Sequence, residues 1–432
     1  MRILVVSRGV IGGDMAGPGN RAYHIAQVLA KEVPGAEVTL AVPRQVEQPQ
    51  VPGVQIAPYT GFSALSLVSK HDIIISSGLM PQLVLNFRDK LFVADLFGQS
   101  FMEWLELITS ESGGVKRMAW MNKNYAYIKM QLTLADFILC SNERQRDSYI
   151  GMMAGLGLVD PEMYANDATL RRCIDVVPNG LRHEQMISDQ KVLKGVYAGI
   201  KEGDKVILWN GGMVSWYDPE TFLRALHLLA KERNDIKALF LGTFYPGLGS
   251  FLGEGQMFEP AFQLSKDLGL YQRSVCFEFG WVPHAQVKNF LLESDMGICT
   301  YLDNLETRYS HRTSFLDLMW AELPIICTRG DVLAEMVAQR DLGVVVAEGD
   351  VAAVADAIRR LVDDKAFYEQ CQKNLRAVKP DLSWEIALEP LIHFCREANP
   401  TSVAKRDRFL PLLSRSAEYL LSGFLDTVAP KQ

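Results

Sequence analysis

Short apolar runs recur along the first half of the chain, and segments with helical periodicity separate them. The runs are rich in Val, Ile and Leu, which predicts buried strands. They cover residues 3–7, 37–42, 72–76, 90–95 and 136–141. Between the first two runs, the segment 21–32 places Ile25, Val28 and Leu29 on one face of an amphipathic helix.

The same alternation starts again in the second half. Its apolar runs cover residues 205–212, 236–242, 274–280, 295–300, 324–328 and 343–347. Strands that alternate with helices predict parallel sheets covered by helices on both faces. We therefore expect an α/β chain of two doubly wound domains, residues 1–182 and 195–385, followed by C-terminal helices over 386–432. The turn Pro178-Asn179-Gly180 is a candidate hinge between the domains.

Length and composition narrow the possible functions. A chain of 432 residues is too long for one core, and its net charge of −7 argues against a nucleic-acid-binding protein, which needs a basic face. Seven scattered cysteines without Cys-x-x-Cys spacing exclude a zinc ribbon and indicate reduced cysteines. No charged and then apolar leader opens the sequence, and the longest apolar stretch, 150–159, is too short to span a membrane. We therefore expect a cytoplasmic protein.

The ends of the predicted strands indicate where a ligand would bind. In open α/β sheets ligands bind at the carboxyl ends of the strands, so two such domains would face each other across a cleft. After the first strand, residues 9–22 hold five glycines ahead of a helix, and backbone amides in that setting favour an anion, naturally a phosphate. The glycines assigned to this site are Gly12, Gly13, Gly17 and Gly19. A surface loop without a ligand is the alternative.

The equivalent turn of the second domain holds Gly211 and Gly212. Glycines at these positions would let a ligand approach the backbone closely. A plain tight turn explains the two glycines equally well.

The stretch 309–331 carries charged residues where a buried segment should have none. Its first half predicts a helix, and a helix N-terminus flanked by Arg312 and the hydroxyl of Thr313 suits a phosphate. Asp317, one turn further on, would then hold ribose hydroxyls. Alternatively, Ser314-x-x-Asp317 is a capping pattern, in which Asp317 caps its own helix and Arg312 pairs with it.

Other kinds of site find no support in the sequence. The seven histidines show no His-x-x-x-His or similar ligand spacing, and no Gly-x-Ser-x-Gly elbow or Ser/His/Asp order is present. We therefore expect neither a metal site nor a hydrolase.

Four stretches together carry a resemblance to a known family. They are VSRGVIGGDMAGPGNRAYHIAQVLAKE, IDVVPNGL, VCFEFGWVPHAQVKNFLLESDMGI and LDLMWAELPIICTRGDVLAEMV. In matching order from residue 2 to about residue 390, the chain resembles retaining glycosyltransferases of the GT-B fold, family 4. The resemblance implies two Rossmann-like domains and a hexosyltransferase-type enzyme without a metal or other cofactor. The second domain would bind a nucleotide-diphosphate sugar, and the first would bind a glycan, lipid-linked or small-molecule acceptor.

The resemblance also implies roles for individual residues. Asp317 stands where the family has an acid, usually a glutamate, that binds the donor ribose. The segment 280–283, with Trp281 and Val282, resembles the one that contacts the nucleotide base through backbone groups. Asp95 stands where the family often has a histidine that reaches the donor sugar.

The sequence departs from the family pattern around the donor phosphates and sugar. The family's E-x7-E pair would place its first glutamate at Tyr309, so Glu306 becomes the candidate for a displaced sugar-contacting acid. The usual phosphate-binding arginine and lysine fall on Gly212 and Tyr217. Because Arg312 occupies a slot normally held by glycine, we expect it to serve the diphosphate instead.

The C-terminal stretch 405–428 combines basic residues with apolar residues near helical spacing. One interpretation is peripheral contact with the inner face of the membrane, which would suit a lipid-linked acceptor. The other is a helix that packs back on the first domain, as GT-B chains often end.

Two other functions remain open at this point. One is a non-enzymatic two-domain ligand-binding protein, which normally needs an export signal. The other is a nucleotide-sugar epimerase or phosphorylase-like enzyme of the same fold. An assay with donor alone would separate the epimerase from a transferase.

Overall fold

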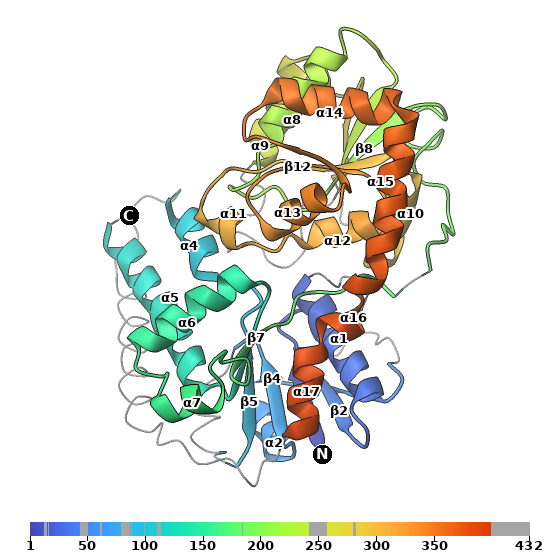
Figure 1. The fold of residues 1–432 in the computed structure, drawn as a ribbon. Helices are drawn as coiled ribbons and strands as arrows, with labels where there is room; N and C mark the ends of the chain where they lie inside the picture. Colours follow the sequence, from blue (N-terminus) through green and yellow to red (C-terminus); the bar gives the residue numbers. More distant parts are fainter. Residues whose placement is uncertain are drawn as a thin grey trace. The chain divides into compact units, whose positions relative to one another are not determined.

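The computed structural model describes residues 1–12, 15, 17–43, 51–60, 63–78, 87, 89–98, 100–109, 114–183, 185–241, 257–279 and 282–398. The chain divides into two compact units (Figure 1). Unit 1 comprises Met1–Asn179 together with the chain from Trp384 onward, and unit 2 comprises Gly180–Ser383. The first boundary falls inside the Pro178-Asn179-Gly180 turn, and the residues between the two expected domains belong to unit 2.

Unit 1 is built on a seven-stranded parallel sheet in the order β3-β2-β1-β4-β5-β6-β7. The strands are β1 (Arg2–Val6), β2 (Glu37–Val42), β3 (Val54–Pro58), β4 (Ile73–Ser76), β5 (Leu91–Asp95), β6 (Phe137–Cys140) and β7 (Ile174–Val176). The helices between them are α1 (Gly17–Glu32), α2 (Ser63–Ser69), α4 (Ser100–Thr109), α5 (Gly114–Leu134), α6 (Glu143–Gly155) and α7 (Pro161–Asn166). Helices cover both faces, which is why the strands are continuous apolar runs rather than alternating ones.

Two helices that follow unit 2 in the sequence belong to the core of unit 1. They are α16 (Trp384–Ala387) and α17 (Glu389–Glu397), drawn in red beside α1 in Figure 1. Trp384, Leu391 and Cys395 are buried in the same cluster as Ile3 of β1, and the Trp384 ring stacks on His24 of α1 at 4.7 Å. The stretch 405–428 lies outside the described residues.

Unit 2 repeats the architecture with a six-stranded parallel sheet in the order β10-β9-β8-β11-β12-β13. The strands are β8 (Lys205–Asn210), β9 (Ile236–Leu241), β10 (Val275–Phe277), β11 (Met296–Cys299), β12 (Ile325–Thr328) and β13 (Gly343–Val346). The helices are α8 (Pro219–Leu229), α9 (Phe258–Asp267), α10 (His284–Glu293), α11 (Leu305–Tyr309), α12 (Thr313–Trp320), α13 (Val332–Gln339), α14 (Val351–Asp363) and α15 (Lys365–Val378), followed by the 3-10 turn η1 (Lys379–Leu382).

Strand β8 shows how the unit 2 sheet is buried on both faces. Val206 and Leu208 point into the cluster formed with α10, α12 and α13, while Ile207 and Trp209 point into the cluster formed with α8, α9 and α14. Figure 1 shows α8 and α14 on one side of this sheet and α12 and α13 on the other. The strand order reverses between β8 and β11 here, and between β1 and β4 in unit 1. Such a reversal opens a crevice at the carboxyl ends of the two strands, where ligands bind.

All seven cysteines are free, and six of them are buried. This agrees with the expectation of reduced cysteines. Among the described residues, the helices are too short or too polar to cross a bilayer.

Candidate active site

The crevice of unit 2 begins at the end of β8 with Asn210 and Gly211. Gly211 has a φ of +146°, a backbone conformation that residues with a side chain rarely adopt. A β-carbon at Gly211 would lie 3.9 Å from the β-carbon of Ser314 in the first turn of α12. The backbone of this glycine turn therefore faces the N-terminus of α12. At Gly212 an added β-carbon would meet no atom of the described part of the chain within 4 Å.

Asp317 lies in the second turn of α12 and faces two partners from other elements. Its Oδ1 accepts a hydrogen bond from Arg182 Nε at 2.7 Å, and its Oδ2 accepts one from Asn210 Nδ2 at 3.0 Å. The N-cap residue of α12, Arg312, makes no side-chain capping bond, and both Asp317 oxygens accept from residues outside the helix. The side chain remains 26% exposed, which leaves the carboxylate accessible to a ligand.

Arg312 and Glu306, assigned above to the diphosphate and the sugar, form an ion pair with each other. Arg312 places one guanidinium nitrogen 3.1 Å from Glu306 Oε1 and the other 2.5 Å from Glu306 Oε2. Both side chains are at most 4% exposed, and the rings of Tyr217 and Tyr301 each lie 5.1 Å from the guanidinium carbon. Burial alone would lower the pKa of Arg312, but the charge of Glu306 raises it overall. Arg312 is therefore a fixed cation among aromatic rings.

A third buried charge, Asp331, adjoins this pair. Asp331 is fully buried between β12 and α13, and its Oδ1 caps α13 by accepting from Ala334 N at 2.7 Å. Its Oδ2 lies 3.9 Å from Arg312 Nε. Burial raises the pKa of this carboxyl, while the charge of Arg312 opposes the shift. The three charges join the loops after β11 and β12 into one rigid group.

Three further residues of unit 2 are predicted to bind the donor, and the structure describes two of them. Thr313 is exposed at the first position of α12, so its hydroxyl is accessible at the helix N-terminus. The side chain of Val282 is 8% exposed and packs into the core. Trp281 lies outside the described residues.

In unit 1 the assigned acid, Asp95, is held by Arg21. Arg21 Nε lies 2.8 Å from Asp95 Oδ2, and a second guanidinium nitrogen lies 2.9 Å from Asp95 Oδ1. The same guanidinium donates to Val177 O and to Asn179 Oδ1, both at 2.9 Å. Arg21 therefore ties α1 and the end of β5 to the chain that leaves β7.

The glycine-rich loop of unit 1 packs against the start of α1. A β-carbon at Gly19 would lie 2.4 Å from Val10 O, so this position excludes any side chain. Gly12 has a φ of +125°, while a β-carbon at Gly17 would meet no atom within 4 Å among the residues that the structure describes. Gly13 lies outside the described residues.

Two of the partners could have been suspected from the sequence and two could not. Asn210 and Asp331 directly follow predicted strands, where functional side chains gather. Arg21 and Arg182 carry no local signal, because their roles depend on residues far away in the sequence. In the described part of the chain, no three His, Cys, Asp or Glu side chains are close enough to hold a metal ion.

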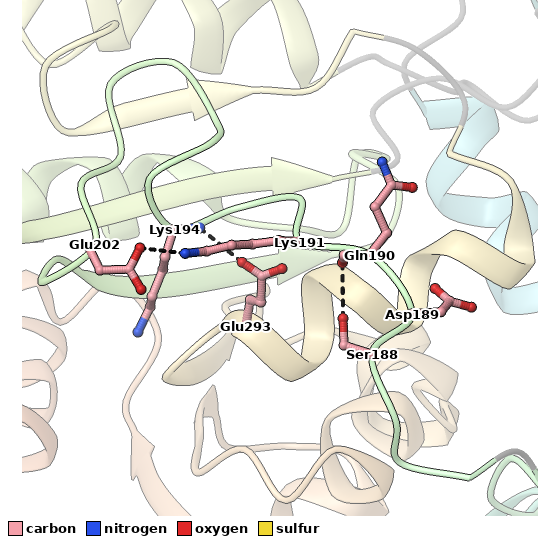
Figure 2. A pocket seen from close by; sticks show the side chains of 7 residues that line it. All are labelled: Ser188, Asp189, Gln190, Lys191, Lys194, Glu202 and Glu293. Carbon is pink, nitrogen blue, oxygen red and sulfur yellow. Dashed lines mark hydrogen bonds and ion pairs between the residues drawn. The ribbon is translucent and has the colours of Figure 1, made fainter.

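A cavity of about 410 Å³ on unit 2 is lined by none of the crevice residues described above (Figure 2). Its lining residues are Ser188, Asp189, Gln190, Lys191, Lys194, Glu202 and Glu293. Glu293 accepts hydrogen bonds from the backbone amides of residues 192, 193 and 194, and Lys191 pairs with Glu202 at 2.6 Å. These bonds hold the segment 188–194 against α10. Because the charged groups are bonded to one another, the cavity is not a candidate for the active site.

The comparison with protein families matches residues 197–378 to the family described as Glycosyl transferases group 1. The match covers most of unit 2, including the whole crevice. Unit 2 is a glycosyl transferases group 1 domain. The chain is accordingly a glycosyltransferase, as the sequence indicated. The comparison with curated proteins found no match.

Solved structures resemble this glycosyltransferase over nearly its whole length. Anabaena HepE in complex with UDP-glucose covers 91% of this chain and 99% of its own, with 14% identity and a TM-score of 0.62. WaaG, a glycosyltransferase involved in lipopolysaccharide biosynthesis, covers 91% and 98%, with 15% identity and a TM-score of 0.59. An E. coli structure described as trehalose-6-phosphate bound with UDP-2-fluoro glucose covers 92% and 100%, with 14% identity and a TM-score of 0.62. At these identities the likeness concerns the fold, and it confirms the expected GT-B architecture of two Rossmann-like domains.

Proposed function

We propose that this glycosyltransferase is a retaining enzyme of the family 4 type. It would transfer a sugar from a nucleotide-diphosphate sugar to a glycan, lipid-linked or small-molecule acceptor. The crevice between β8 and β11 carries the proposal, because Gly211, the N-terminus of α12 and Asp317 converge there. A UDP-sugar is the first donor to test, since the similar HepE structure was solved with UDP-glucose.

The two ends of the crevice suit different parts of the donor. The first amides of α12 and its dipole favour an anion, and the exposed Thr313 hydroxyl adds a donor, so this end suits the diphosphate. The Asp317 carboxylate accepts only, so its end suits the ribose hydroxyls. Gly212 leaves room beside the diphosphate.

We assign Arg312 and Glu306 a positioning role in this site. Their ion pair and the contact with Asp331 fix the loop after β11 against the start of α12. By fixing this loop, the buried charges hold the N-terminus of α12 in place, and that N-terminus forms the diphosphate site. In unit 1, Asp95 would likewise have a positioning role, through its ion pair with Arg21.

Nucleotide binding tests the proposal most directly. UDP, GDP and ADP are added singly to the full chain in a thermal-shift assay, because a ligand that binds the folded state raises the melting temperature. We expect one of them to raise it, and the matching sugar nucleotide then to give transfer with retention, read from the anomeric signals of the product by NMR. No shift with any of them at millimolar concentration would contradict the proposal.

The acceptor and the cellular location are part of the same proposal. A lipid-linked acceptor would fit peripheral contact of the 405–428 stretch with the cytoplasmic face of a membrane. Co-sedimentation with anionic liposomes, full chain against a version ending near residue 402, measures this contact. Equal pelleting of the two versions would refute it. We also propose that transfer needs no metal, so EDTA should leave the rate unchanged.

A further inference from the structure

Arg182 is a cation with a largely buried side chain at the point where the chain enters unit 2. Its side chain is 7% exposed, and the preceding residue, Leu181, donates its amide to Leu382 O at 2.8 Å. The entering and the leaving segments of unit 2 are thus bonded to each other beside Arg182. The guanidinium carbon lies 5.8 Å from the Trp320 ring, so the arginine packs on the end of α12.

Arg182 and Asn210, from different parts of the chain, each donate a hydrogen bond to one oxygen of Asp317. Arg182 Nε donates to Oδ1 at 2.7 Å, and Asn210 Nδ2 donates to Oδ2 at 3.0 Å. A carboxylate offers about four lone-pair sites, so each oxygen keeps room for about one more hydrogen bond. Because both oxygens are held, the plane of the carboxylate is fixed and its remaining lone pairs have set directions.

We infer that Arg182 is a positioning residue that orients Asp317 to accept hydrogen bonds from the two neighbouring hydroxyls of the donor ribose. This inference rests on the proposed function, in which Asp317 holds the ribose. It extends that function by making recognition of the sugar hydroxyls depend on a residue outside the donor crevice. The arginine also offsets the charge of Asp317, which otherwise would repel the nearby diphosphate.

The chemistry of arginine suits this task better than that of lysine. The guanidinium is planar, always charged and directional, whereas a lysine ammonium is a point charge on a flexible stem. A lysine at position 182 would keep the charge and lose the fixed Nε direction. The two properties of Arg182 can therefore be separated by substitution.

The surroundings of Arg182 favour a folded variant. A cavity of about 380 Å³ borders it, lined also by Met186, Trp320 and Lys379. Removing the guanidinium would extend this open cavity, which water can fill, rather than leave a sealed void. Lys379 is already paired with Glu322 at 3.1 Å, so it has an acid partner of its own.

The test compares a ribonucleotide with its 2′-deoxy analogue. Calorimetry on the full chain measures affinities for UDP and 2′-deoxy-UDP in the wild type, Arg182→Ala and Arg182→Lys. A lost charge-assisted hydrogen bond corresponds to about tenfold or more in affinity. In Arg182→Ala we expect UDP affinity to fall about tenfold or more, and 2′-deoxy-UDP affinity to fall less, because that nucleotide has only one of the two hydroxyls to lose. The readout is the ratio of UDP affinity to 2′-deoxy-UDP affinity, which should fall in Arg182→Ala and lie between the Ala and wild-type values in Arg182→Lys. In both variants the KM for the donor sugar nucleotide should rise while kcat stays nearly unchanged.

Two further variants make the outcome decisive. Arg359→Ala removes another ion-paired arginine of unit 2, bonded to Glu232 at 2.7 Å, and should keep the wild-type ratio. Asn210→Ala removes the second hydrogen bond to Asp317 and should lower the ratio even if Arg182→Ala does not fold. An unchanged ratio in folded Arg182 variants, or in Asn210→Ala, would overturn the inference. Equal wild-type affinity for both nucleotides would overturn it while leaving the transferase proposal standing, and no binding of any nucleoside diphosphate would overturn both.

Discussion

Arg312 and Glu306 form a two-armed ion pair inside unit 2, with nitrogen–oxygen distances of 2.5 and 3.1 Å. The pair joins α11 to the residue that precedes α12. Both side chains are at most 4% exposed, so water screens their attraction little. Because the positive charge of Arg312 is already paired inside the protein, replacing Arg312 should mainly lower the stability of the fold.

The first prediction concerns the loss of one member of this pair. Arg312→Ala leaves Glu306 buried without its cation, and breaking a buried pair on one side costs about 3–5 kcal/mol. We expect urea denaturation to show a loss of that size. The double variant Arg312→Met with Glu306→Leu removes both charges, so its free energy of unfolding should fall less than that of Arg312→Ala. A stable Arg312→Ala protein with weakened nucleotide affinity would instead make Arg312 a phosphate ligand.

Local patterns in the sequence predicted the elements of the fold because burial repeats along each strand and helix. The run 205–212 indicated β8, and the apolar face of residues 21–32 indicated α1. Gly211 follows a predicted strand, and Asp317 is a charge in a segment expected to be buried, so the sequence itself indicates both as candidates. The partners of the charges were harder to predict. Arg182 and Asp317 are 135 residues apart, and only the folded chain brings them together. Arg312 and Glu306 are six residues apart, yet their pairing depends on the turn between α11 and α12.

The second prediction is a pH dependence at Asp331. Burial raises its pKa above the usual 3.8, although the charge of Arg312 opposes the shift. The folded protein therefore keeps a proton that the unfolded chain releases near pH 3.8. Stability from this group is full below that pH and is lost as the pH rises through the folded-state pKa. Asp331→Asn cannot ionise and still caps α13, so we expect it to match or exceed wild-type stability at pH 7.

The advantage of Asp331→Asn should shrink as the pH falls toward 4. Urea denaturation at a series of pH values measures it. Asp350→Asn is the matched control, because Asp350 caps α14 by accepting from Ala353 N at 2.9 Å in an exposed setting. It should show no such trend. A wild-type advantage that grows with pH would show that Asp331 is stabilised as an anion.

The third prediction concerns the pair of Arg21 and Asp95 in unit 1. Their side chains are 5% and 12% exposed, so Asp95→Ala should cost about 3 kcal/mol by leaving Arg21 without its counter-ion. Asp356→Ala is the control, since its side chain is 74% exposed in its pair with Arg359, and such a surface pair contributes below about 1 kcal/mol. Chemical denaturation followed by fluorescence measures both. A stable Asp95→Ala protein with a large loss of kcat would place Asp95 in contact with the donor sugar instead.

The last prediction uses the two neighbouring glycines at the end of β8. Gly211→Ala forces a side chain into a φ of +146°, which costs about 1–3 kcal/mol, so stability and nucleotide affinity should both fall. Gly212 has no such backbone conformation, and an added methyl would meet no atom of the described residues within 4 Å. Gly212→Ala should therefore keep wild-type stability within about 0.5 kcal/mol. If the diphosphate lies beside this glycine, the methyl should nevertheless weaken UDP binding by about tenfold or more, because it occupies the space of the ligand. Thermal melting and calorimetry on the two variants separate these effects, and unchanged affinity in Gly212→Ala would place the diphosphate away from this turn.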